Sequence, residues 1–213
     1  MIHTVIFDFD GTLADTLDIF IAAYNKIASR YALDAIDPAQ KEFLRNFGAR
    51  ELIRKYRISP WKLMTLTRRM RSQLKKEGGS TSFFEGIDTL FQDLKRKGFR
   101  IGIVTSNSEE KVKSCLEKWH ISSDVDFIHS ERNIFGKAKA FSHVLKKYSL
   151  SKEEVIYVGD EVRDIEAAHQ VGIPIISVTW GFNSKERLAQ SQPEHLALRP
   201  SEILEIVSAH GAV

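Results

Sequence analysis

The chain has 213 residues, of which 43% are hydrophobic and 10% aromatic, and its formal net charge is +3. A chain of this length and composition can bury a core without disulfides or a structural metal, which excludes an intrinsically disordered protein. The single cysteine, Cys115, excludes an internal disulfide and a cysteine-rich zinc cluster, and it favours a cytoplasmic location. Residues 1–8 lack the cationic segment of a signal peptide, and no apolar run is long enough to span a membrane.

Charge is distributed unevenly along the chain. Residues 16–82 contain 14 lysine and arginine side chains but only 6 acidic ones, whereas the rest of the chain contains 17 basic and 22 acidic side chains. This asymmetry predicts two parts, of which the basic one can attract anions.

Short runs of apolar and β-branched residues predict buried strands. Their nearly continuous apolar character indicates burial on both faces. They lie at Thr4–Phe7, Arg100–Thr105, Val125–Ile128, Val155–Val158 and Ile173–Val178. Segments of helical character separate the last four runs, which is the pattern of an α/β fold with a Rossmann-like parallel sheet flanked by helices. One of these segments opens with Asn107-x-x-Glu110, which is typical of a capping box.

The interval between the first two runs is longer than an ordinary crossover connection. Its apolar spacing and two prolines predict helices around 19–31, Phe43–Phe47, Leu52–Tyr56 and Trp61–Leu74. Gly78-Gly79-Ser80 marks the end of this stretch, and a helix at Ile87–Lys97 returns the chain to the sheet. We therefore expect a catalytic core of residues 1–15 and 83–213, with an inserted α-helical cap of residues 16–82.

The first predicted strand runs directly into Asp8-Phe9-Asp10-Gly11-Thr12-Leu13-Ala14-Asp15-Thr16. In an open parallel sheet the carboxyl end of a strand faces the ligand crevice. Asp8 and Asp10 can hold a hard cation through oxygen atoms, or they can divide the roles of nucleophile and acid–base catalyst. The structural alternative is a turn with solvated acids that cap the next helix.

A second acidic pair follows the strand at Val155–Val158, in Gly159-Asp160-x-x-x-Asp164. Because this is again the carboxyl end of a strand, Asp160 can reach a cation placed between neighbouring strand ends. Asp164 can order a metal-bound water or a cationic side chain, although an aspartate at a helix start is also an ordinary cap.

Groups that can grip phosphate oxygens follow the other predicted strands. Thr105 offers a hydroxyl group, and Ser106 precedes a helix whose first backbone N–H groups face the same crevice. The structural alternative is that the polar residues after Thr105 only cap that helix. Lys137 stands at the start of a later helical stretch and would bring a positive charge there, with Lys139 as a close rival.

These four elements, in this order, resemble the four motifs of the haloacid dehalogenase superfamily, and the inserted helices resemble the small cap of its phosphoglycolate phosphatase-like branch. The resemblance covers nearly the whole chain. The chain departs from the usual pattern after Lys137, where Ala138-Lys139-Ala140 stands in place of Pro-x-Pro.

The resemblance implies a phosphatase that forms an aspartyl-phosphate intermediate. Asp8 would attack phosphorus, and Asp10 would protonate the leaving alkoxide and then activate the water that hydrolyses the intermediate. Thr105, the Ser106 backbone N–H and Lys137 would stabilise the oxygens of the transferred phosphoryl group.

The resemblance also implies a magnesium site. Mg²⁺ would be held by Asp8, the backbone carbonyl of Asp10 and Asp160, where it offsets the repulsion between carboxylate and phosphate. Asp164 would position Lys137 or a water molecule on the metal.

The substrate is expected to be a small phosphate monoester, with phosphoglycolate, pyrophosphate, a nucleotide and a sugar phosphate all open. Arg50, or less favourably Arg45, can pair with a second anionic group of that substrate. The alternative is a nucleic-acid- or protein-binding module with a vestigial site, suggested by Arg68-Arg69-x-Arg71 and Lys75-Lys76. No recognised nucleic-acid motif accompanies these residues, so nucleic acid is not expected as the partner.

Overall fold

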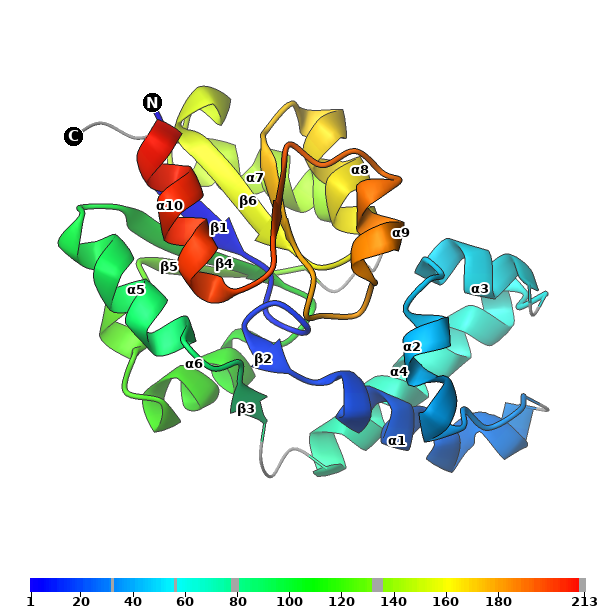
Figure 1. Ribbon diagram of the computed structural model, residues 1–213. Helices are drawn as coiled ribbons and strands as arrows, with labels where there is room; N and C mark the ends of the chain where they lie inside the picture. Colours follow the sequence, from blue (N-terminus) through cyan, green and yellow to red (C-terminus); the bar gives the residue numbers. More distant parts are fainter. Residues whose placement is uncertain (32, 56, 78–80, 132–135, 211–213) are drawn as a thin grey trace.

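Six parallel strands form the central sheet of the computed structural model (Figure 1), which describes residues 1–31, 33–55, 57–77, 81–131 and 136–210. The strand order is β5-β4-β1-β6-β7-β8. Their bounds are Thr4–Phe7 (β1), Arg100–Thr105 (β4), Phe127–Ser130 (β5), Val155–Gly159 (β6), Ile175–Val178 (β7) and His195–Ala197 (β8). The predicted α/β fold with a Rossmann-like parallel sheet is confirmed.

Helices cover both faces of this sheet, and each face has its own apolar cluster. One face packs against α5 (Ile87–Arg96), α6 (Glu109–Lys118) and α10 (Pro200–His210). The other packs against α7 (Lys137–Lys147), α8 (Val162–Val171) and α9 (Lys185–Ala189). Burial on both faces explains why the strand sequences are almost continuously apolar.

The strand β5 ends at Ser130 and β6 at Gly159, slightly beyond the predicted ends, and β5 and β7 begin later than predicted. The run predicted from Val125 begins pairing only at Phe127, because the Asp126 carboxylate accepts the Ile101 backbone N–H (2.7 Å) just before the ladder starts. The run predicted from Ile173 begins at Ile175, since Pro174 has no N–H to donate. The edge strand β8 has only three residues, too few for a recognisable period.

The start of α6 also differs from the prediction. Ser108 is its N-cap, with its hydroxyl oxygen accepting the Lys111 backbone N–H, so the prediction that Asn107 caps this helix is wrong. The Asn107 side chain donates instead to the Asp10 carboxylate. Near the acidic crevice, the Asn107 side chain can either cap the helix or donate to Asp10, and the local sequence spacing does not reveal which partner it takes.

The long interval after β1 folds into helices, as expected. Its helices are α1 (Leu17–Ala28), α2 (Lys41–Leu44), α3 (Ala49–Lys55) and α4 (Pro60–Glu77), with short 3₁₀ turns at Ser29–Tyr31 and Pro38–Gln40. Figure 1 shows α1–α4 gathered at one end of the sheet, on the side of the short strands β2 (Ala14–Asp15) and β3 (Ser82–Phe83). The predicted end signal at 78–80 lies outside the described residues.

The chain leaves and re-enters the core through β2 and β3, which pair antiparallel with Asp15 opposite Ser82. A separate small cluster of Ala23, Ile27, Leu66 and Met70 joins α1 to α4 and does not merge with either sheet cluster. The division into residues 1–15 with 83–213 and residues 16–82 stays a prediction, which this separate cluster supports.

A hydrogen-bonded contact attaches the loop after α2 to the loop after β7. The Arg45 guanidinium donates to the backbone carbonyls of Thr179 (2.6 Å) and Gly181 (2.9 Å). In return, the Asn183 amide donates to the backbone carbonyls of Arg45 (3.2 Å) and Phe47 (3.1 Å). Arg45 therefore directs Nε and Nη2 to the main chain of the core, while its Nη1 pairs with Glu42 (2.8 Å). We call the contacts between Arg45, Asn183 and the main chain the Arg45–Asn183 clamp.

No helix in the described parts of the chain is long and apolar enough to cross a membrane. The cytoplasmic location expected from the single cysteine stays a prediction.

Replacing Asn183 tests the clamp. Asn183→Ala removes both amide donors and also the acceptor of the Val162 backbone N–H (2.9 Å), so buried main-chain groups lose their partners. We expect the free energy of unfolding, measured by urea titration, to fall by about 1–3 kcal/mol. The exposed Gln190→Ala is the matched control, and equal effects of the two changes would contradict the clamp.

Candidate active site

The carboxyl ends of three adjacent strands bring the predicted site residues to one edge of the sheet. β1 lies between β4 and β6, and Phe7 is in register with both Ile103 and Val158. Since the strands are parallel, the residues that follow them emerge side by side. Asp8 continues the ladder by donating its backbone N–H to the Val158 carbonyl (2.9 Å).

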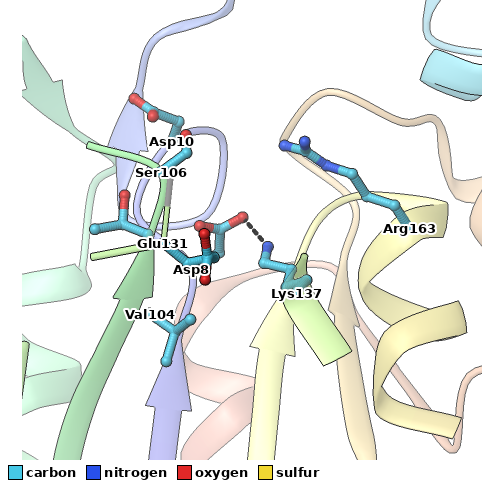
Figure 2. A pocket seen from close by; sticks show the side chains of 8 residues that line it. Asp8, Asp10, Val104, Ser106, Glu131, Lys137 and Arg163 are labelled. Atoms are coloured by element: carbon cyan, nitrogen blue, oxygen red, sulfur yellow. Dashed lines mark hydrogen bonds and ion pairs between the residues drawn. The ribbon is translucent and has the colours of Figure 1, made fainter. Parts of the chain in front are cut away.

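The Asp8 carboxylate lies at the centre of this edge and is almost fully buried. Its Oδ1 accepts the Phe9 backbone N–H (2.7 Å), and its Oδ2 accepts Lys137 Nζ (2.5 Å; Figure 2). Lys137 Nζ also pairs with the Asp164 carboxylate, so one ammonium group bridges two acids. Lys139 lies exposed on the same helix, and the structure therefore brings Lys137, not its rival, to Asp8.

Burial shifts the pKa values of these charged groups. Burial raises the pKa of Asp8 to about 6, even though the neighbouring Lys137 opposes the rise. The pKa of Asp160 is raised well above its usual range by burial and by the surrounding acids Glu161, Asp164 and Asp8. Burial lowers the pKa of Lys137, but Asp164 and Asp8 outweigh it and the net shift is upward.

Three buried carboxylates make up a candidate metal centre. Asp8, Asp160 and Asp164 each offer an oxygen atom, and these atoms lie within 4.8 Å of one another. Carboxylate oxygens are the donors that hard divalent cations prefer, and burial, the largest cause of the raised pKa values of Asp8 and Asp160, makes their charged forms costly without a nearby cation. The residues present thus fit a divalent metal ion.

The position of Asp160 is fixed by two hydrogen bonds. Its Oδ1 accepts the Thr12 hydroxyl (2.7 Å) and its Oδ2 accepts the Phe182 backbone N–H (2.7 Å). Gly11, at φ +77°, carries the chain closely past this carboxylate, and a Cβ atom there would overlap both Asp160 and the Phe182 ring. The turn after Asp10 therefore requires glycine both for its backbone conformation and for space.

The Asp10 side chain points away from the Asp8 carboxylate (Figure 2). Its Oδ2 accepts the Asn107 amide (2.5 Å), and Lys111 Nζ donates to the carbonyl oxygen of that amide (3.1 Å). The Asn107 backbone N–H in turn donates to the Thr105 hydroxyl (3.1 Å). Asn107 thus joins two predicted site residues, a role that sequence reasoning missed because it assigned this residue to helix capping.

A cavity opens between these groups (Figure 2). It is lined by Asp8, Asp10, Val104, Thr105, Ser106, Glu131, Lys137 and Arg163. The structure thus gathers the predicted Asp8, Asp10, Thr105, Ser106 and Lys137 around one space. Glu131 and Arg163 were not foreseen. Arg163 stands inside the fourth motif, between Asp160 and Asp164. This position was the one sequence feature that could have indicated that Arg163 lies at the site.

Arg50, the predicted substrate-binding residue of the insertion, reaches the core. Its guanidinium pairs with Glu166 on α8 (2.8 Å). Arg50 helps to line a second cavity, which Lys137 and Arg163 also border, together with Ala138, Glu166, Ala167 and Gln170. Arg45 lines neither cavity, because it belongs to the Arg45–Asn183 clamp.

The shifted pKa of Asp8 predicts a pH-dependent stability of the metal-free protein. Its pKa is about 6 in the folded chain against the ordinary value of 3.8, so the folded state binds more protons in this window. Stability should therefore fall as pH rises from about 4 to above 6, with Asp8 contributing up to about 3 kcal/mol. In Asp8→Asn this fall should be smaller, as measured by urea unfolding in chelator at several pH values.

The control for this experiment is Asp88→Asn, which changes an exposed aspartate on α5. If the free energy of unfolding falls equally in Asp8→Asn and in the control between about pH 4 and above pH 6, burial does not raise the proton affinity of Asp8.

Comparison with known proteins places this geometry in a family. A family model described as haloacid dehalogenase-like hydrolase matches residues 5–178. A phosphoglycolate phosphatase from Synechococcus elongatus is 34% identical over 206 residues, covering 97% of each chain. A pyrophosphatase PpaX from Bacillus mycoides is 24% identical over 222 residues, again covering 97% of each chain.

Solved structures agree on the fold. A haloacid dehalogenase-like family protein from Streptococcus pneumoniae superposes with a TM-score of 0.79 at 24% identity, covering 97% of this chain and 98% of that one. A predicted phosphatase from Clostridium acetobutylicum gives a TM-score of 0.83 at 21% identity, covering 98% and 100%. Since the family model spans most of the chain and the Synechococcus relative matches nearly all of it, this protein belongs to the haloacid dehalogenase-like hydrolases.

Proposed function

We propose that this protein is a magnesium-dependent phosphatase that hydrolyses a small phosphate monoester through an aspartyl-phosphate intermediate. The observation that carries the proposal is the buried Asp8 carboxylate, held by Lys137 and grouped with Asp160 and Asp164 at one strand edge. Family membership supports phosphatase chemistry, and the phosphoglycolate phosphatase from Synechococcus elongatus supports phosphoglycolate as the substrate class.

In this proposal Asp8 acts as the nucleophile. A bond forms between its carboxylate oxygen and phosphorus while the bond from phosphorus to the ester oxygen breaks, and the leaving oxygen takes the electron pair. Water then attacks the same phosphorus and releases Asp8 with inorganic phosphate. Lys137 Nζ, already 2.5 Å from Asp8 Oδ2, supplies positive charge where negative charge accumulates on the phosphoryl oxygens.

In this proposal Asp10 transfers the protons to the leaving oxygen and from the attacking water. It lines the same cavity as Asp8, where it can protonate the leaving oxygen and then accept a proton from the attacking water. The Asn107 amide donates to one of its oxygens and leaves the other for the substrate. Asn107 therefore acts as a positioning residue. Thr105 and the backbone N–H of Ser106 complete the binding of the phosphoryl oxygens.

Asp8 and Asp160, with the backbone carbonyl of Asp10, would hold Mg²⁺, and Asp164 would position Lys137 or a water molecule on the metal. The ion supplies positive charge that offsets the repulsion between the Asp8 carboxylate and the phosphate dianion. The carboxylate of Asp10 is not part of the buried acidic group of Asp8, Asp160 and Asp164, which agrees with a proposed role for its main-chain oxygen alone.

Pyrophosphate is the second candidate substrate, favoured by the similarity to the Bacillus mycoides pyrophosphatase. The nucleic-acid- or protein-binding alternative has less support, because Asp8, Lys137 and Asp160 stand in a chemically competent arrangement. Of the basic residues in the insertion, Arg45 and Arg50 contact the core and are not simply presented to an external partner.

A panel of phosphate esters with Asp8→Asn tests the proposed function. The wild-type chain with Mg²⁺ should release phosphate, with the highest kcat/KM on phosphoglycolate or pyrophosphate, and chelator should abolish the reaction. Asp8→Asn should lower kcat by at least about 10⁴-fold, because the nucleophile is lost. Mass spectrometry of acid-quenched protein should find the phosphoryl adduct on Asp8 only in the wild type. Mg²⁺-dependent hydrolysis retained by Asp8→Asn would reject Asp8 as the nucleophile.

Lys137 and Lys139 provide a matched pair on one helix. Lys137→Ala should lower kcat by about 10²–10³-fold, because it removes the cation beside the transferred phosphoryl group. Lys139→Ala removes an exposed lysine two residues away and should stay within about threefold of the wild type. A larger loss in Lys139→Ala than in Lys137→Ala would assign the phosphate-binding role to Lys139.

A further inference from the structure

Arg163 reaches the cavity from a different side than the other cavity-lining residues. It stands in the first turn of α8, and its guanidinium points toward the space beside Asp8 and Lys137, across from Asp10 and Ser106 (Figure 2). The phosphatase mechanism above gives this residue no task. A cation at that place is nevertheless close enough to contribute to the electrostatics of both Asp8 and Lys137.

The hydrogen bonding of Arg163 is incomplete. One Nη atom pairs with the Glu161 carboxylate, whereas Nε is buried and has no hydrogen-bond partner among the described residues. Burying a guanidinium N–H without an acceptor costs free energy, so this cavity-lining side chain is incompletely hydrogen-bonded within the protein. Glu161 holds one end of the guanidinium and thereby limits its motion.

Arg163 also connects the two cavities. Together with Lys137 it borders both the cavity at Asp8 and the second cavity at Arg50. Lys137 is already paired with Asp8 and Asp164. Arg163 is therefore a second cation, besides Lys137, between the phosphoryl site and the arginine of the insertion.

We propose that Arg163 determines substrate specificity by binding a second anionic group, a carboxylate or a second phosphate, on the leaving group of the ester. The proposal rests on the proposed phosphatase function. A guanidinium presents adjacent N–H donors in a planar fork that matches two oxygens of a carboxylate or phosphate. Phosphoglycolate and pyrophosphate both carry such a group next to the scissile bond, whereas 2-hydroxyethyl phosphate has a neutral hydroxyl group in its place.

A purely structural role is the competing explanation. Arg163 lies near the acids Glu161, Asp164 and Asp8, all of which raise its pKa against the effect of burial. If it served only as their counter-ion, removing it would weaken the reaction of every ester equally. The ratio of kcat/KM between an anionic and a neutral leaving group separates the two roles, because a loss common to all substrates cancels in the ratio.

The experiment compares wild type, Arg163→Gln and Arg163→Lys on phosphoglycolate, pyrophosphate and 2-hydroxyethyl phosphate. For Arg163→Gln, the ratio of kcat/KM for the anionic substrates to that for 2-hydroxyethyl phosphate should fall by roughly 10- to 100-fold, mainly through KM. Arg163→Lys keeps the charge but loses the fork, so its ratio should fall less. If the ratio falls for phosphoglycolate alone, the second anionic group that Arg163 binds is a carboxylate. If the ratio falls for pyrophosphate alone, that group is a phosphate.

Arg199→Gln is the matched control, since Arg199 is an exposed arginine whose ion pair with Glu202 lies within the α10 region. Its ratio should equal that of the wild type. An unchanged ratio in both Arg163 variants, with wild-type unfolding curves, would overturn the specificity role while leaving the phosphatase proposal intact. A wild-type chain that hydrolyses none of the esters would instead overturn the proposed function, and this inference with it.

Discussion

The burial of three neighbouring carboxylates is the constraint on which the architecture of this site depends. Asp8, Asp160 and Asp164 lie within 4.8 Å of one another where water cannot screen them, and like charges at such separation oppose ionisation. Lys137 bridges two of the three and acts to lower the pKa of Asp8, but burial outweighs it and raises that pKa to about 6. The folded chain thus carries a local excess of negative charge that a divalent ion would balance.

The fold maintains this unfavourable arrangement because rigid elements hold each acid separately. β1 and β6 are neighbours in the sheet, so Asp8 and Asp160 cannot move apart without breaking the ladder. Thr12 and the Phe182 backbone hold Asp160, while the capping box of α8 holds Asp164. Burial of the two apolar sheet faces stabilises the fold enough to keep these charged groups close together, as stable scaffolds commonly do for unfavourable functional sites.

Most of the fold and the acidic centre could be predicted from the sequence because both rest on strong local patterns. Buried strands need continuous apolar runs, and acids directly after such runs must emerge at the crevice edge. The remainder depends on which of several similar side chains reaches a given partner in the folded chain, and local sequence does not reveal this. Lys137 and Lys139 have equivalent local surroundings, and only the helix rotation that carries Lys137 to Asp8 separates them. Asn107 could equally cap a helix or donate to Asp10, and the neighbouring Ser108 takes the cap.

Arg45 and Arg50 show how two arginines with similar local sequence acquire different tasks. Arg45 donates to neutral backbone carbonyls, so it fixes the position of the insertion without placing charge in the crevice. Arg50, held at that position, reaches the cavity that Arg163 borders from the core. Both arginines therefore border the same cavity, Arg50 from the insertion and Arg163 from α8. If the proposed roles of Arg50 and Arg163 hold, the choice of substrate depends on residues of both the insertion and the sheet.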